Sequence, residues 1–169
     1  LLNTRSMSEE LIDYVNEQDE VIGAAARTEI YAQKLRHRIA HVFLFDREGA
    51  IALARRGKEV SYCPDHWTST AAGHVDAGES YEEAARREMQ EEIGVTIPLD
   101  ACGVTPFIKE GTGHHKFLGT FKAVYEGVFV CDPLEVQYVQ YFSPATIREM
   151  LAAGEPFHPE TAMLLNHYF

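Results

Sequence analysis

The chain has 169 residues, the length of one domain, and 46% of them are hydrophobic and 24% charged. This composition indicates a globular protein and excludes a long disordered or low-complexity one. Its 26 acidic and 15 basic residues give a formal net charge of -11, which argues against nonspecific binding to duplex nucleic acid.

The N-terminus and the cysteines bear on location. No apolar run approaches the roughly 20 residues that a membrane-spanning helix needs. Leu1–Glu10 lacks the basic start and apolar centre of a secretory signal, and we treat the residues before Met7 as an extension or cloning remnant outside the fold. Three scattered cysteines without a C-x-x-C spacing exclude a disulfide framework and a cysteine zinc site: Cys63, Cys102 and Cys131. A reducing, cytoplasmic compartment is therefore expected.

The first third of the chain predicts two pairs of strands. Leu11–Asn16 and Val21–Arg27 flank four polar residues and form a predicted hairpin, which a helical turn at Thr28–Lys34 follows. Ile39–Asp46 is strand-like, and a three-residue turn leads to a return strand over Ala50–Arg56.

The middle of the chain contains its clearest helix. Residues 57–72 are irregular, and a helix is then predicted over Tyr81–Ile93. Ser80 is a natural N-cap, and Glu83 three residues later completes the capping-box pattern. Gly94 is a natural stop.

The remainder of the chain alternates strands with helices. After Pro98, strands are predicted at Phe117–Val130 and Val136–Phe142, and helices at Pro144–Ala153 and Pro159–Tyr168. No internal repeat or linker divides the chain. These elements predict an α/β (α+β) domain in which helices pack on a sheet.

Negative charge is concentrated around the predicted central helix. Gly73–Val95 holds seven carboxylates against two arginines, which is five of the eleven net negative charges. An apolar stripe suited to packing on a sheet runs through Ala85, Met89 and Ile93. Three carboxylates lie on one arc beside that stripe: Glu88, Glu91 and Glu92. Like charges at this spacing destabilise a helix, and a hard dication such as Mg²⁺ or Mn²⁺ reverses the effect. The alternative interpretation is a solvated acidic face.

The same residues carry a family resemblance. Gly73–Glu79, seven residues, and Arg87–Val95 match every fixed position of the pattern G-x5-E-x7-R-E-U-x-E-E-x-G-U, in which U is aliphatic and Met89 fills the first U. The segment therefore resembles the Nudix box. The resemblance implies a Nudix fold, a mixed β-sheet sandwiched between helices, over residues 35–169. Residues 1–34 would form an N-terminal extension that contains the hairpin.

Nudix enzymes are metal-dependent hydrolases that cleave a diphosphate linked to another moiety. By resemblance, Glu88, Glu91 and Glu92 hold Mg²⁺ or Mn²⁺, and the carbonyl of Gly73 is a further oxygen ligand. Such cations neutralise an anionic diphosphate, polarise its phosphoryl oxygens and lower the pKa of bound water.

The resemblance also implies bracing and catalytic roles. Glu79 and Arg87 are expected to form a salt bridge that braces the loop against the helix, although Arg87 is equally placed to pair with Glu91. Glu91 is the first choice for the base that takes a proton from the attacking water. Glu135 and Glu126, outside the box, are alternatives that are also consistent with ordinary surface residues.

A second resemblance concerns the segments around the box. Leu35–Arg38 and Trp67–His74 resemble isopentenyl-diphosphate isomerase and its relatives within the Nudix superfamily. That isomerase places a catalytic cysteine shortly before a metal-binding histidine, and the matching positions here are Ala71 and Ala72. Alanine cannot move a proton at a carbon centre, and Cys63 lies too early in the chain to replace the missing thiol. The isomerase reaction is therefore expected to be lost.

Histidines raise the question of a second metal site. His37 and His74 match metal-binding positions of the isomerase, so a second site is one hypothesis, and hydrogen-bonded structural histidines are the other. His114 and His115 precede a predicted strand and are expected to be solvated.

Other residues near the box are candidates for substrate contacts. Arg55, Arg56 and Lys58 follow the return strand and would either guide an anion or form a solvated strand end. Tyr62 and Trp67 could stack on a base or pack against a prenyl-like tail, and Trp67 could equally belong to the core.

Three functions follow as hypotheses. The leading one is a Mg²⁺-dependent pyrophosphohydrolase of the isomerase-like branch, acting on a nucleoside diphosphate derivative or a related organic diphosphate. The alanines disfavour a diphosphate isomerase, and the complete set of box carboxylates disfavours a nucleotide-binding regulatory module without turnover. We expect a small-molecule partner, neither duplex nucleic acid nor a membrane, and, by analogy with the family, homodimer contacts through the hairpin.

Overall fold

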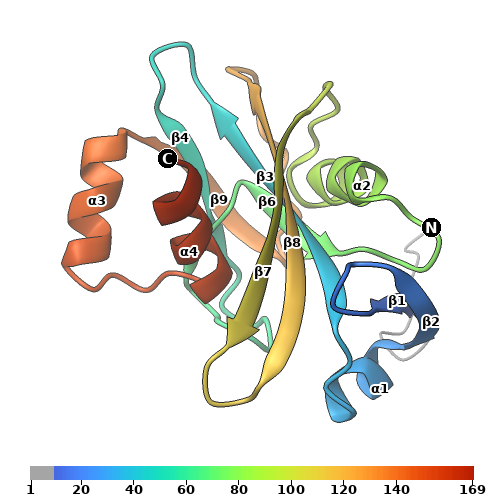
Figure 1. Ribbon diagram of the computed structural model, residues 1–169. Helices are drawn as coiled ribbons and strands as arrows, with labels where there is room; N and C mark the ends of the chain where they lie inside the picture. The colour runs from blue at the N-terminus through green and yellow to red at the C-terminus, as the bar shows by residue number, and fades with distance from the viewer. Residues whose placement is uncertain (1–9) are drawn as a thin grey trace.

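The computed structural model describes residues 10–169 (Figure 1). The predictions about a secretory signal and about the residues before Met7 concern residues 1–9 and lie outside the described part of the chain. No helix within residues 10–169 is long and apolar enough to cross a membrane. All three cysteines are free.

Within residues 10–169, nine strands form one mixed sheet and four helices accompany it. The strands are β1 Leu11–Val15, β2 Val21–Ala26, β3 His37–Phe45, β4 Ile51–Arg56, β5 Trp67–Thr68, β6 Ala71–His74, β7 Asp100–Lys109, β8 His114–Val124 and β9 Val136–Phe142. The helices are α1 Arg27–Ala32, α2 Tyr81–Ile93, α3 Pro144–Ala152 and α4 Pro159–Tyr168. Helix α2 covers one face of the sheet, while α3 and α4 cover the other (Figure 1).

Strand β3 is the centre of the sheet. One edge pairs in parallel with β8 along its whole length, from His37 opposite Lys116 to Phe45 opposite Val124. The other edge is shared in turn by β1, β6 and β4, all antiparallel. Because β6 lies in this shared edge, the start of the acidic box is anchored in the middle of the sheet.

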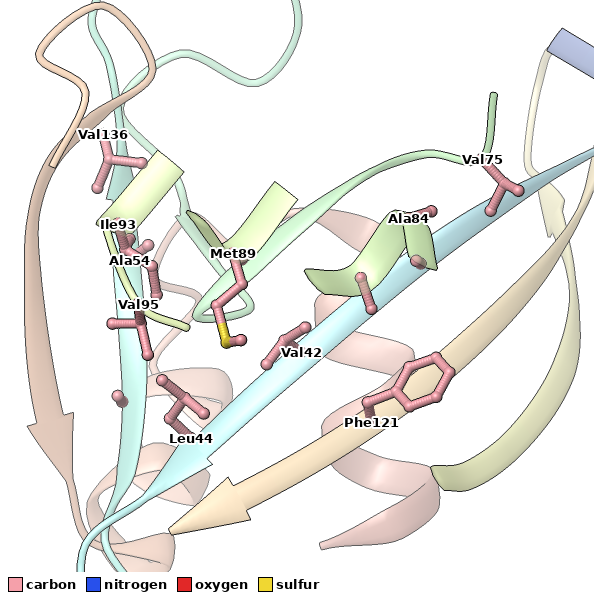
Figure 2. Packing of buried hydrophobic residues seen from close by; sticks show 14 residues of the cluster. Val42, Leu44, Ala54, Val75, Ala84, Met89, Ile93, Val95, Phe121 and Val136 are labelled. Carbon is pink, nitrogen blue, oxygen red and sulfur yellow. The ribbon is translucent and has the colours of Figure 1, made fainter. Parts of the chain in front are cut away.

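The alternation of side chains along β3 separates two cores. Ala40, Val42 and Leu44 are fully buried toward α2, where they belong to a cluster with Met89 and Ile93 (Figure 2). The intervening Ile39 and Phe43 belong to a second cluster that contains residues of α3 and α4. Truncation of a buried side chain such as Met89 to alanine costs about 2–5 kcal/mol, so α2 is fixed firmly on the sheet.

Several predicted elements are confirmed. The hairpin is formed by β1 and β2, which pair antiparallel. Helix α2, strand β9 and helix α4 have the predicted bounds. Strand β1 also pairs with β3, so the hairpin belongs to the same sheet as the rest of the domain. The division between residues 1–34 and 35–169 stays a prediction.

Other predicted bounds are wrong. The predicted strand Phe117–Val130 starts earlier, at His114, and ends at Val124, after which the chain forms an exposed loop that contains Gly127. Strand β7 was not predicted, because Gly103 and Pro106 disfavour a strand; the sheet tolerates them because β7 is an edge strand with a register shift beside Gly103.

The region 57–72 also contains more structure than predicted. Strands β5 and β6 begin within it, at Trp67 and Ala71. Helix α1 begins at Arg27 and ends at Ala32, displaced from the predicted Thr28–Lys34. These short elements are set by pairing with distant strands, and their local sequence gives little signal.

Candidate metal centre

The acidic helix α2 is fixed at both ends by its own sequence. The Ser80 hydroxyl accepts the Glu83 amide at 3.1 Å, and the Glu83 carboxylate accepts the Ser80 amide at 2.8 Å. Gly94 ends the helix in a left-handed conformation with φ of 67°. An N-cap of this kind is worth about 1 kcal/mol. These local interactions hold the helical carboxylates in place relative to β6.

Glu88 lies directly against the backbone of β6. A Cβ atom at Gly73 would lie 2.2 Å from Cδ of Glu88, closer than any real contact allows. Only 17% of the Glu88 side chain is exposed. Glycine at position 73 is therefore what allows this carboxylate to reach the strand that carries the predicted carbonyl ligand.

Glu92 is the second carboxylate held at β6. Its Oε1 accepts the Ala72 amide at 2.9 Å. Burial, reinforced by the charge of Glu88, raises the pKa of Glu92 well above its usual range. Burial likewise raises the pKa of Glu88 to about 7, although the Arg87 guanidinium opposes this. Two neighbouring carboxylates with raised pKa values favour either protons or a cation.

Arg87 connects the helix to the preceding loop. Its guanidinium donates to both oxygens of Glu79, at 2.8 and 2.9 Å, and to the His74 carbonyl at 2.9 Å. It also donates to Glu88 at 2.8 Å and, more weakly, to the exposed Glu91 at 3.4 Å. Arg87 thus contacts both of its predicted partners, Glu79 and Glu91. The interaction with Glu79 is the stronger one, because it consists of two parallel hydrogen bonds.

The pKa values of Glu79 and Arg87 agree with this salt bridge. Burial would raise the pKa of Glu79, but the hydrogen bonds from Arg87 outweigh it and hold that pKa below its usual range. The same bonds raise the pKa of Arg87. Glu79 is therefore a structural anion, committed to Arg87 and to the Asp76 amide at 2.8 Å.

The donor set fits a hard dication. Glu88 and Glu92 offer carboxylate oxygens, the ligands that Mg²⁺ and Mn²⁺ prefer, in a place where a cation would offset two like charges. Glu91 stands beside them, with 57% of its side chain exposed. Within residues 10–169, no three His, Cys, Asp or Glu side chains already converge as a ready-made cage. Two half-buried carboxylates are thus the preformed part of the candidate centre.

The two alternative bases lie in different places. The negative charge of Glu135 contributes to raising the pKa of Glu92, so Glu135 faces the centre. Glu126 instead accepts the Arg47 amide at 2.8 Å, at the turn between β3 and β4. Of the two interpretations of Glu126, the structure supports the ordinary surface residue, because its carboxylate is committed to that turn.

The predicted cationic trio is dispersed. Arg55 donates to Asp65 at 2.9 Å, and the guanidinium of Arg56 donates to the carbonyls of Tyr62 and Cys63. Lys58 is exposed. The positive charge of Arg56 acts on the candidate centre, since it partly offsets the rise of the Glu92 pKa.

Trp67 belongs to the core. It is 6% exposed, its indole N–H donates to Glu155 at 3.1 Å, and Arg55 covers its ring at 4.8 Å. The prediction that Trp67 stacks on substrate is therefore wrong, because both the ring and its polar end are already in contact with protein.

The structure brings His37 and His74 together as a stack. Their ring centroids are 5.5 Å apart and the rings are 11° from parallel. His37 bonds the Leu35 carbonyl through Nδ1 at 2.9 Å, and His74 bonds the Tyr31 hydroxyl through Nε2 at 2.7 Å. Nearly parallel rings do not aim two lone pairs at one point, which favours the structural interpretation. Nε2 of His37, however, is buried without a hydrogen-bond partner among residues 10–169, so the second metal site stays a prediction.

Burial keeps this stack uncharged. It lowers the pKa of His37 to about 4 and that of His74 well below its usual range. The ring of His114 also contacts Tyr31, with centroids 5.4 Å apart, so the prediction of a solvated His114 is wrong. His115 lies beside it on β8 and is half-buried.

A buried polar cluster beneath α4 was not predicted from the sequence. Glu160 is 4% exposed and accepts from Lys116 at 3.2 Å. His41 contacts Glu160 at 3.2 Å and the Ser69 hydroxyl at 2.6 Å. Burial would raise the pKa of Glu160, but the charge of Lys116 and the hydrogen bond to His41 lower it well below its usual range. No signal in the sequence indicated it, because Lys116 lies before the predicted strand and its partner Glu160 is 44 residues away.

His158, which caps α4 in this cluster, gives a pH-dependent prediction. Its Nδ1 accepts the Glu160 amide at 3.2 Å, and burial lowers its pKa from 6.5 to about 4. The unfolded chain therefore binds one more proton than the folded chain between these values, so His158 contributes to loss of stability as the pH falls from 6.5 toward 4. The groups that face it are Glu160, His41, Lys116, Arg56 and the ring of Tyr62.

His158→Asn keeps an acceptor for the capped amide but cannot titrate. We expect the free energy of unfolding lost between pH 7.5 and 4.5 to be about 2 kcal/mol smaller in His158→Asn than in the wild type. Urea unfolding at several pH values, with a chelator present, measures this difference. Identical pH profiles for the two proteins would contradict it.

Comparisons with known proteins agree with the box. A model of the NUDIX domain family matches residues 35–165. The uncharacterized Nudix hydrolase YfcD of Escherichia coli K12 is 34% identical over 162 residues, which cover 95% of this chain and 87% of that protein. A Nudix hydrolase of Deinococcus radiodurans is 31% identical over 167 residues, which cover 96% of each.

A solved structure agrees with the family match. The crystal structure of DR0079 from Deinococcus radiodurans superposes with a TM-score of 0.81 at 26% identity, covering 95% of this chain and 99% of that one. The superposition extends over nearly the whole of both chains, and the predicted Nudix fold is confirmed.

Proposed function

From the premise that the chain belongs to the Nudix hydrolase family, we propose that it hydrolyses the phosphoanhydride bond of a small-molecule diphosphate with the help of Mg²⁺ or Mn²⁺. The substrate class is a nucleoside diphosphate derivative or a related organic diphosphate. The observation that carries the proposal is the pair of half-buried carboxylates held against β6: Glu88 lies on Gly73, and Glu92 accepts the Ala72 amide at 2.9 Å.

The residues have separate tasks in this proposal. Glu88, Glu92 and Glu91, with the Gly73 carbonyl, hold the cation. A bound dication withdraws charge from the phosphoryl oxygens and makes the attacking water more acidic. Glu91 accepts the proton of that water, because its side chain is exposed and makes only a long contact to Arg87. The salt bridge between Glu79 and Arg87 holds the loop that precedes α2 against the helix.

The placement within the family is a finer proposal. The isomerase-like segments contain Ala71 and Ala72 where that enzyme has cysteines, so we propose a hydrolase of this branch without isomerase activity. The alanine side chains offer no proton donor or acceptor at this end of β6. Conversion of isopentenyl to dimethylallyl diphosphate by the protein would contradict this proposal.

A substrate panel tests the function. Dinucleotides, nucleotide sugars, nucleoside di- and triphosphates and prenyl diphosphates are incubated with the protein and Mg²⁺ or Mn²⁺, and release of phosphate or monophosphate is scored. We expect turnover of at least one diphosphate, and none when a chelator removes the metal. Binding of a nucleotide without turnover would favour the regulatory module instead.

Location and assembly remain predictions. The three free thiols support a cytoplasmic location. Homodimer contacts through the hairpin are tested by sedimentation of the purified protein.

A further inference from the structure

The N-terminal hairpin touches the box directly. It lies outside residues 35–165, the part that the family model matches. Yet Ile12 of β1 forms a bridge with Asp76, and the Leu11 carbonyl accepts the Ala77 amide at 2.9 Å. We call residues 75–79, which connect β6 to the N-cap of α2, the box loop. The hairpin thus extends its pairing onto this loop.

Asp13 makes the contact at the centre of the box loop. Its Oδ2 accepts the Gly78 amide at 2.9 Å, across 65 residues of sequence. Asp13 is 9% exposed, and Gly78 has φ of 82°, a conformation that side chains rarely allow. A buried carboxylate that receives one loop amide holds that loop more strongly than a neutral acceptor would.

The box loop carries one partner of the salt bridge between Glu79 and Arg87. Its last residue is Glu79, whose carboxylate also accepts the Asp76 amide at 2.8 Å. Glu79 holds the Arg87 guanidinium, which in turn contacts Glu88 at 2.8 Å. A continuous series of hydrogen bonds therefore leads from Asp13, through the loop, to a carboxylate of the centre.

A second contact fixes the other end of the loop. Asp19, in the turn of the hairpin, accepts from the Tyr81 hydroxyl at 2.8 Å and from Nε of Arg38 at 2.7 Å. Tyr81 is the first residue of α2. The hairpin therefore holds the box loop in the middle and at the start of the helix that follows it.

We propose that Asp13 is a positioning residue of the metal centre, acting through the Gly78 amide on Glu79 and Arg87. Its meaning for catalysis depends on the proposed function, while its effect on metal affinity does not. The hairpin is then part of the working site, even though the family pattern does not include it.

Asp13→Ala removes the acceptor, and Asp13→Asn retains an oxygen that can accept the same amide. We expect Asp13→Ala to weaken Mn²⁺ binding and to lower kcat by about tenfold or more, the usual effect of losing a residue that orients metal ligands. Asp13→Asn should recover part of both, because its neutral oxygen accepts the same amide more weakly than the carboxylate does. Mn²⁺ affinity is measured by electron paramagnetic resonance on the full chain without substrate, and kcat on the best substrate of the panel.

Ser143→Ala is the matched control. Ser143 caps α3 by accepting the Thr146 amide at 3.1 Å, so its loss also removes one acceptor for one amide, but in a helix outside the box. We expect its melting temperature to fall by a few degrees with Mn²⁺ affinity unchanged. Asp13→Ser keeps the buried position polar but is too short to reach Gly78, and it provides the same test if Asp13→Ala does not fold.

The outcomes separate the two proposals. Wild-type affinity and kcat in Asp13→Ala or Asp13→Ser would overturn the positioning role, as would an equal loss of affinity in Ser143→Ala. If the wild type binds Mn²⁺ but turns over no diphosphate, the proposed function fails. The affinities of the Asp13 variants still decide the role of this residue.

Discussion

We expect Glu92→Gln to abolish metal-dependent phosphate release while the protein remains folded. We expect a loss of about a thousandfold or more, because removing one anionic ligand forfeits several kcal/mol of charge stabilisation in the transition state. Glutamine has nearly the same shape and can still accept the Ala72 amide that Glu92 accepts at 2.9 Å. The variant therefore changes the charge of the centre with little change in its packing.

The stability of Glu92→Gln distinguishes a lost ligand from a damaged fold. Burial and the charge of Glu88 raise the pKa of Glu92, so the metal-free folded state gains when this charge is removed. With a chelator at pH 8, we expect the variant to melt no lower than the wild type. Saturating Mn²⁺, at 100 times the dissociation constant, should stabilise the wild type by about 2.7 kcal/mol and the variant far less.

Glu82→Gln provides the matched control on the same helix. Glu82 is exposed and pairs only with Arg86, at 2.8 Å, one turn further along the helix. The same chemical change at this position should leave kcat and the Mn²⁺ response within about twofold of the wild type, because exposed pairs contribute little. Full activity in Glu92→Gln would overturn the assignment of the metal centre.

The part of the site that sequence could predict is the part governed by local rules. Helix α2 has its predicted bounds because Ser80, Glu83 and Gly94 set them within a few residues. The salt bridge between Glu79 and Arg87 follows from the pattern of the box, and it is present. The closeness of Glu88 to β6 was not predicted. The structure shows that it requires glycine at position 73, because a Cβ atom there would lie 2.2 Å from Cδ of Glu88.

The parts that could not be predicted depend on distant pairs. Asp13 meets Gly78 across 65 residues, and Lys116 meets Glu160 across 44. Nothing in either local sequence indicates a partner, since a single aspartate or lysine is most often a surface residue. Trp67 illustrates a case in which the sequence left two interpretations open, substrate contact or the core, and the strand pairing of β5 places the ring in the core.

Arg87→Ala should lower both stability and activity. The side chain donates to both oxygens of Glu79, to Glu88 and to the His74 carbonyl, so its removal leaves two carboxylates near each other without a cation. We expect about 2 kcal/mol less stability at pH 7, below the range for fully buried pairs because 28% of the side chain is exposed. Activity should fall by about tenfold to a hundredfold, since the loop that supports the centre loses its brace.

The stability difference between Arg87→Ala and the wild type depends on pH in a defined direction. Arg87 lowers the pKa of Glu79 below its ordinary value of 4.5, so this pair stabilises the folded state above pH 4.5 and less as the pH falls through the lowered pKa. The difference between wild type and variant should therefore narrow as the pH falls below 4.5. Unfolding by urea at several pH values measures it.

Arg87→Lys and Arg86→Ala show whether geometry or charge is responsible. Lysine keeps the charge of Arg87 but cannot form the fork to Glu79 while also reaching the His74 carbonyl, so we expect it to recover little activity. Arg86 is the neighbouring arginine, exposed and paired only with Glu82, and its loss should cost no more than about 0.5 kcal/mol. Full recovery in Arg87→Lys would mean that positive charge alone braces the loop, and the forked hydrogen bonds to Glu79 would then have no special role.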